Sequence, residues 1–140
     1  MDCSARMLEI CANKRVYKEL IKSIIDGDNI PKELENKEYG VITCSGMMVA
    51  GHLPRESFEV MHKLLKIGGF LMFNVRDAVW DEKITDKLGY KSKVEEMIKD
   101  GKFEEAARLP FTYYKGYKGE EGVSEYIREQ PGSVFVYRRT

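Results

Sequence analysis

The chain has 140 residues, which is enough for one domain with one hydrophobic core. Apolar residues make up 43% and charged residues 33%, a balance that argues against a disordered polar chain. The 23 basic and 23 acidic side chains cancel, so no global field draws the chain to nucleic acid or to an anionic membrane. We therefore expect partners of neither kind.

The three cysteines (Cys3, Cys11 and Cys44) are odd in number and form no Cys-x-x-Cys pair, which argues against a disulfide framework. His52 and His62 are the only histidines, so a zinc site of the usual spacing is not expected. No apolar run reaches the length of a membrane span, and the first residues lack a signal-peptide pattern. The expectation is a protein with reduced thiols in the cytoplasm.

The first predicted element is a helix from Ser4 to about Asn13, with Met7, Leu8 and Cys11 on one face and Ser4 as N-cap.

The next segment, Val16–Ile25, stays open between helix and strand. Its leucine and isoleucines fit a helical stripe, whereas its β-branched residues and Tyr17 also suit a strand. The run from Asp26 to Asn29, followed by Pro31, ends this element in either case.

The middle of the chain predicts a βαβ unit. Tyr39–Ser45 is a short apolar run typical of a strand buried on both faces, and Pro54–Lys66 has a helical stripe with proline at its first position. Gly68 is placed to take the left-handed C-terminal cap of that helix, and Phe70–Val75 follows as a second buried strand. The two strands should be parallel, with a right-handed crossover.

The last third predicts a helix over Tyr90–Lys99, capped by Gly101. Phe111–Tyr117 and Ser133–Arg138 are predicted strands, and Val123–Glu129 is a candidate short helix. No linker or repeat interrupts the chain, so residues 1–140 are expected to form a single domain.

Several motifs in order resemble those of class I S-adenosylmethionine-dependent methyltransferases. Asp2, Ser4, Met7 and Leu8 match the D-x-S-x-x-M-L signature that follows the second strand of that fold.

Further along, Tyr39–Ile42 with Gly46 resembles the fourth strand, and Lys66–Leu71 resembles the K-P-G-G turn into the fifth. Gly51–Pro54 and Asn74–Arg76 are similar to the methyltransferase-like family named after the Williams-Beuren syndrome region. The chain departs from the family at Gly40, where the family usually has Asp, and at Ile67, which replaces Pro.

The resemblance implies an α/β chain with a partial Rossmann-like methyltransferase fold. The family orders its strands 3-2-1-4-5-7-6, and the first two strands and the glycine-rich loop have no counterpart in the sequence. The expectation is a domain shortened at its N-terminus that keeps strands 4, 5, 7 and 6, an open and mostly parallel sheet with a C-terminal antiparallel pair.

The resemblance also implies S-adenosylmethionine as cofactor. Asp2 is the candidate ribose ligand, because a carboxylate can accept two hydroxyl protons, although it also suits the start of a helix. Asp26 and Asp28 are candidates for the adenine edge, or simply a solvated Asp-Gly turn.

Other candidates follow the predicted strands, where open α/β sheets bind ligands. Ser45, Gly46 and Met47 are placed to meet the cofactor, or form an ordinary loop. His52 is a candidate substrate contact or a packed loop residue. Arg76 is a candidate for binding a substrate carboxylate, or pairs with a nearby acid such as Asp77 or Asp81.

Together these features predict transfer of a methyl group to an unknown, small-molecule acceptor. Without the glycine-rich loop, the isolated chain is expected to be inactive. The alternative is a non-catalytic module that binds a protein partner, or a second copy of itself, through the strand left exposed.

Overall fold

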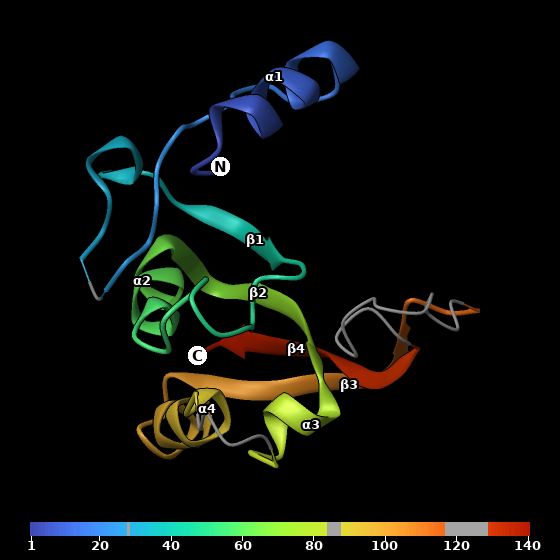
Figure 1. Cartoon of the computed structure of the whole chain (residues 1–140). Coiled ribbons are helices and arrows are strands. Elements are labelled where there is room, and N and C mark those ends of the chain that lie inside the picture. The colour runs from blue at the N-terminus through green and yellow to red at the C-terminus, as the bar shows by residue number, and fades with distance from the viewer. Residues whose placement is uncertain (28, 84–87, 117–128) are drawn as a thin grey trace.

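The computed structural model describes residues 1–27, 29–83, 88–116 and 129–140. Four strands form one open sheet in the order β1-β2-β4-β3 (Figure 1). Their bounds are β1 Tyr39–Cys44, β2 Leu65–Arg76, β3 Phe103–Tyr113 and β4 Gln130–Arg139. β1 and β2 are parallel, and β4 runs antiparallel to β2 and β3. This is the predicted arrangement of strands 4, 5, 7 and 6.

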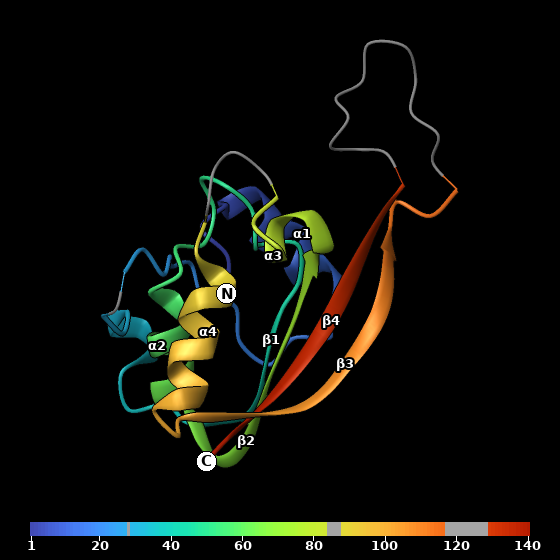
Figure 2. The ribbon, with the colours of Figure 1, turned by 90° about the horizontal axis from the view of Figure 1, so that it is seen from below.

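The helices that cover one face of this sheet are α2 Ser57–Leu64, α3 Asp77–Trp80 and α4 Tyr90–Lys99. Helix α1 Ala5–Lys14 and a 3₁₀ turn η1 at Lys32–Leu34 precede β1 in the chain, and α1 has no buried residue. Figure 2 shows α2, α3 and α4 on the same side of the strands. α2 contacts β2, α3 contacts β2 and β4, and α4 contacts β3. No helix of the described residues is long and apolar enough to cross a membrane.

Burial along β2 alternates with the two-residue period of a strand. Leu71, Phe73 and Val75 are buried on the helix side, whereas Phe70 and Asn74 point to the other side and keep part of their surface. Phe73 is central to the core. Its ring lies 5.3 Å from Phe58, 5.4 Å from Phe135, and 5.9 Å from both Trp80 and Tyr137.

The sheet face opposite these helices is open. Its large apolar side chains remain substantially exposed: Val41 at 51%, Phe70 at 36%, Leu109 at 53% and Phe111 at 39%. We call this surface the open face.

The predicted βαβ unit is confirmed, with corrections at both ends of its helix. α2 begins at Ser57, so Pro54 does not stand at its first position. α2 ends at Leu64 and the chain passes directly into β2 at Leu65, so Gly68 does not cap the helix. Instead Gly68, at φ +76°, lies in a bulge where the register jumps from Tyr39↔Leu65 to Val41↔Phe70. A side chain on Gly69 would meet the Gly40 carbonyl oxygen at 2.9 Å, so the bulge also needs the second glycine.

The strand prediction for Tyr39–Ser45 is right about the element and wrong about its burial. β1 is an edge strand, and Val41 and Thr43 are exposed on the open face while Ile42 and Cys44 are partly buried on the helix side. A strand is buried on both faces only when a layer packs on each face, and among the described residues a layer packs on the helix side alone.

The helix at Ser4–Asn13 is confirmed as α1. The Ser4 hydroxyl accepts a hydrogen bond from the Met7 amide at 3.3 Å, which makes Ser4 the N-cap as predicted. Both interpretations of Val16–Ile25 are wrong. This segment is neither helix nor strand, apart from one isolated parallel bridge between Lys22 and Asp2.

The predicted helix Tyr90–Lys99 is α4. Its end is capped as expected, because Gly101 at φ +71° allows the Lys102 amide to bond Met97 and its own amide to bond Ile98.

β4 is longer than predicted, and β3 begins earlier and ends at Tyr113, so residues 114–116 of the predicted strand form a turn instead. β3 begins at Phe103, well before Phe111, because it pairs along the full length of β4. The predicted helix Val123–Glu129 lies outside the described residues except for Glu129, which is not helical, and Tyr117 also lies outside them.

Candidate functional site

The carboxyl ends of β1 and β2 lie at the same end of the sheet as the carboxyl end of β3 and the start of β4. In register, Cys44 pairs with Phe73, Arg76 with Gly132, and Tyr113 with Gln130. Ligands of open α/β sheets bind outside these strand ends. Two groups of side chains lie at this end of the sheet, where β1 and β2 finish.

The turn after β1 is fixed to β2 by one hydrogen bond. The Gly46 amide donates to the Asn74 Oδ1 at 2.9 Å, and Gly46 adopts φ +71°, which favours glycine. This holds Ser45, Gly46 and Met47 at the end of β1, where all three are exposed. Asn74 was not among the predicted site residues, although it stands in the Asn74–Arg76 motif that could have pointed to it.

The first group lies on the open-face side, and we call it the Arg76 cluster: Arg76, Tyr113 and Gln130. The Arg76 guanidinium donates to Gln130 Oε1 at 3.4 Å. Burial raises the pKa of Tyr113 to about 12, while the nearby Arg76 charge lowers it, so the phenol stays protonated at neutral pH. The Tyr113 ring lies against Gly132, where a Cβ would approach it to 2.8 Å.

Asp77, a predicted ion-pair partner of Arg76, is engaged on the helix side of the sheet. It accepts a hydrogen bond from the buried Ser133 hydroxyl at 3.0 Å and lies 3.9 Å from the Arg108 guanidinium. The Arg108 Nε also donates to the Ser133 hydroxyl, at 3.2 Å. These interactions connect the start of α3 to the β3–β4 pair.

The second group lines a cleft of about 310 Å³ between the loop after β1 and the start of α4. Asp26 and His52 both line it, together with the apolar side chains of Val49 and Leu53. The Tyr90 hydroxyl contacts two backbone carbonyls of this loop and so holds it in place. It donates a hydrogen bond to the Leu53 carbonyl at 2.6 Å, and the Val49 carbonyl is a second acceptor at 3.3 Å. The structure therefore brings together one predicted adenine residue and one predicted substrate residue. We call this the Asp26–His52 cleft.

Two groups near this end of the sheet, the buried Tyr90 and the partly buried Cys44, are poor acids. Burial raises the pKa of Tyr90 to about 12 and that of the Cys44 thiol to about 11. Cys44 therefore stays a thiol at neutral pH and is not a ready nucleophile.

Of the two remaining predicted cofactor residues, one cannot be placed and the other lies elsewhere. Asp28 is outside the described residues. Asp2 lies in the N-terminal segment, where its Oδ1 accepts from the Ser4 amide at 2.7 Å and its backbone bonds Ile21 and Ser23. The carboxylate thus serves the start of α1, as the helix-entry alternative predicted, with lone pairs left over.

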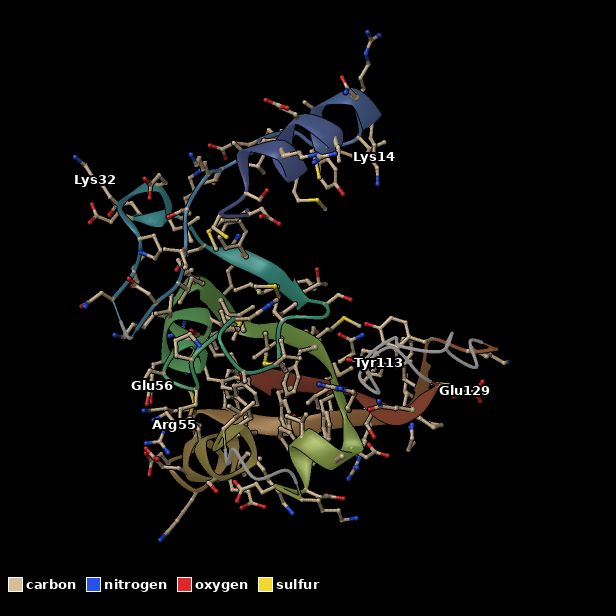
Figure 3. The ribbon with its side chains drawn as sticks, in the orientation of Figure 1. Lys14, Lys32, Arg55, Glu56, Tyr113 and Glu129 are labelled. Atoms are coloured by element: carbon tan, nitrogen blue, oxygen red, sulfur yellow. The ribbon has the colours of Figure 1, made fainter. Side chains whose placement is uncertain are left out.

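The Arg76 cluster and the Asp26–His52 cleft are well separated. Figure 3 labels Tyr113 and Arg55, which lines the cleft, on opposite sides of the molecule. Within residues 1–27, 29–83, 88–116 and 129–140, no group of three or more metal-ligating side chains gathers.

No protein-family model and no curated protein matches the chain. Solved structures do match it. One is a domain from Corynebacterium diphtheriae provisionally named a precorrin-6Y C5,15-methyltransferase targeted domain, with TM-score 0.53, 14% identity, and coverage of 99% of this chain and 72% of that one.

Two others are similar. Precorrin-6y C5,15-methyltransferase from Geobacter metallireducens has TM-score 0.54 and 16% identity, with 97% of this chain aligned to 64% of that one. A protein from Bacillus halodurans provisionally named a methyltransferase has TM-score 0.53 and 17% identity, with 99% of this chain aligned to 80% of that one. The chain therefore has the Rossmann-like fold of methyltransferases.

Proposed function

We propose that the chain belongs to an S-adenosylmethionine-dependent methyltransferase that acts on a small-molecule acceptor. The observation that carries the proposal is the Asp26–His52 cleft, which lies near the carboxyl ends of the strands, where open α/β sheets bind ligands. The motifs at Gly51–Pro54 and Asn74–Arg76 support a place in the methyltransferase-like family of the Williams-Beuren syndrome region.

The residues of the cleft suit the adenine part of the cofactor. Val49 and Leu53 supply apolar surface for a flat ring, and the Asp26 carboxylate is an acceptor for an exocyclic amine. The other end of the cofactor has less to meet. A G-x-G-x-G turn, whose backbone would approach the amino acid end, is absent from the 140-residue sequence.

The Arg76 cluster suits a carboxylate ligand, but it lies on the opposite side of the molecule from the cleft, so we do not place the methyl acceptor there (Figure 3). A guanidinium binds a carboxylate bidentately, and the protonated Tyr113 hydroxyl is a further donor beside it. The bound cofactor would supply an activated methyl group. Methyl transfer needs mainly positioning and exclusion of water, so the protein need not provide an acid–base pair.

Binding of S-adenosylhomocysteine tests the proposal. In ¹⁵N NMR titrations at millimolar ligand, we expect shifts at Asp26 and in the loop from Val49 to Leu53. Asp26→Asn should weaken binding several-fold by removing a charged acceptor, while Glu35→Gln, at another exposed acid, should not. Shifts elsewhere only, or equal effects of both substitutions, would contradict the proposal.

Calorimetry of cofactor binding distinguishes a site that holds only the adenine part from one that holds the whole cofactor. With S-adenosylmethionine at micromolar concentration, the 140-residue chain should give no measurable heat, because the contacts to the amino acid end are lacking. A clear saturable signal would show that these residues suffice. The alternative, a non-catalytic interaction module, has a different supporting observation: among the described residues, β1 pairs with β2 alone and leaves its other edge without a strand.

A further inference from the structure

One wall of the Asp26–His52 cleft is a loop with few hydrogen bonds to the rest of the molecule. The His52 amide donates to the Val49 carbonyl at 3.2 Å, which closes a tight turn with Gly51 at φ +76°. Among the described residues, the Tyr90 hydroxyl makes the only hydrogen bonds that join residues 47–53 to a helix or strand.

Packing anchors only the start of this loop firmly. Met48 is 2% exposed and belongs to the main core cluster, whereas Val49 and Leu53 are only partly buried and His52 is exposed. The part of the loop whose position depends most on Tyr90 is therefore Val49–Leu53, the part that lines the cleft.

Tyr90 is a rigid anchor for this wall. It is the first residue of α4 and is 2% exposed, and its ring meets that of Phe58 edge to face, with 6.2 Å between the ring centroids. Because burial raises its pKa to about 12, the hydroxyl keeps its proton at neutral pH. The hydroxyl is thus a hydrogen-bond donor with a fixed position.

The hydroxyl meets the loop at the two residues that give the cleft its apolar surface. A phenol has one proton to donate, so the 2.6 Å contact with the Leu53 carbonyl is the main bond and the 3.3 Å contact with Val49 is secondary. The side chains of both residues line the cleft. A shift of the backbone at either residue would move the surface that a flat ring contacts.

We propose that Tyr90 is the positioning residue of the cleft, and that its hydroxyl holds Val49 and Leu53 where a flat, adenine-like ring can lie against them. This inference rests on the proposed function, because it takes the cleft to be the site of the adenine ring. A wall that is already in place spares the ligand the cost of ordering the loop, so loss of the hydroxyl lowers the affinity.

Tyr90→Phe tests the inference, because it removes the hydroxyl and keeps the ring. In ¹⁵N NMR titrations with S-adenosylhomocysteine, binding reported by Asp26 and Val49–Leu53 should weaken at least about fivefold. In the free chain, amide exchange at His52 should become faster, because the turn that its amide closes is no longer held. Exchange within β2 should stay unchanged.

Tyr137→Phe is the matched control. Tyr137 is also 2% exposed and also donates a hydrogen bond, to Glu105 at 3.3 Å, but neither residue lines the cleft. This substitution should change ligand binding by less than about twofold. Urea midpoints of both variants measure the loss of stability separately, because a residue with only a structural role would lower the midpoint and leave the dissociation constant unchanged.

The outcomes distinguish this inference from the proposed function. If the parent chain binds in the cleft and Tyr90→Phe binds equally well, or if both tyrosine variants weaken binding equally, the inference is wrong and the proposed function stands. If the parent chain does not bind in the cleft, the proposed function fails, and exchange at His52 still decides whether Tyr90 holds the loop. Unchanged exchange in Tyr90→Phe would then overturn the inference as well.

Discussion

Phe73 and Phe70 lie three residues apart on β2, on opposite faces of the sheet. Phe73 is 1% exposed among four aromatic rings, whereas Phe70 is 36% exposed on the open face. The same residue type in the same strand thus belongs to the core on one side and to the surface on the other. The difference follows from the single layer of helices, since a strand side chain is buried only where something packs on it.

Charged groups show the same contrast. On the helix side, Glu59 of α2 bonds Lys93 of α4 at 2.9 Å and Lys102 at 2.9 Å, and its side chain is only 18% exposed. On the open face, Glu104 and Arg138 pair across neighbouring strands at 2.7 Å, but both are about half exposed. The two ion pairs of Glu59 connect two helices and the turn at Lys102. The ion pair of Glu104 connects two strands that already pair through their backbones.

The largest expected difference is in the free energy of unfolding, between alanine substitutions of the two phenylalanines. Phe73→Ala should cost about 3–5 kcal/mol of unfolding free energy, because it leaves a cavity in the core. Phe70→Ala should cost about 1 kcal/mol or less, because much of its ring is already in water. Urea unfolding followed by circular dichroism measures both. Equal losses would mean that the open face is covered in solution.

A smaller effect separates the two glutamates. Burial raises the pKa of Glu59, but hydrogen bonds from Lys93 and Lys102 outweigh it and hold that pKa below its usual value. Because the native pKa is lowered, the stabilisation is present above the unfolded pKa and is lost as the pH falls through the native one.

Glu59→Gln should therefore cost about 1 kcal/mol at about pH 7, and this difference should narrow at about pH 3. Glu104→Gln should change the stability by no more than about 0.5 kcal/mol at either pH, since exposed pairs contribute little. Urea midpoints at the two pH values test both. A larger effect at Glu104 would reverse the comparison of the two faces.

The sequence allowed prediction of elements whose causes are local. Ser4 caps α1 by a bond to a residue three positions on, and Gly101 ends α4 through its left-handed conformation. The parallel pairing of β1 and β2 also followed, because a helix between two short apolar runs makes a parallel crossover the natural connection.

Contacts between distant parts of the chain could not be predicted from the sequence. The apolar run at Tyr39–Cys44 has the composition of a buried strand, and only its neighbours decide whether it is buried. The meeting of Asp26 and His52 in one cleft likewise depends on how the loop after β1 folds against α4. Neither spacing nor periodicity carries that information.

The smallest expected effect is on the pH dependence of stability, through His62. His62 lies on α2 with its ring 5.2 Å from Phe103, edge to face. Burial lowers the pKa of His62, and the charge of Arg139 lowers it further, so the native state favours the neutral ring. His52 is exposed in the cleft loop.

Below about pH 6.5 the unfolded chain takes up a proton at His62 more readily than the native chain does, so stability falls as the pH decreases. His62→Gln should flatten this dependence between about pH 7.5 and pH 5.5, by less than the Glu59 effect. Urea midpoints across that range measure the slope. A slope that is the same in His62→Gln as in the parent chain would contradict the assignment to this histidine.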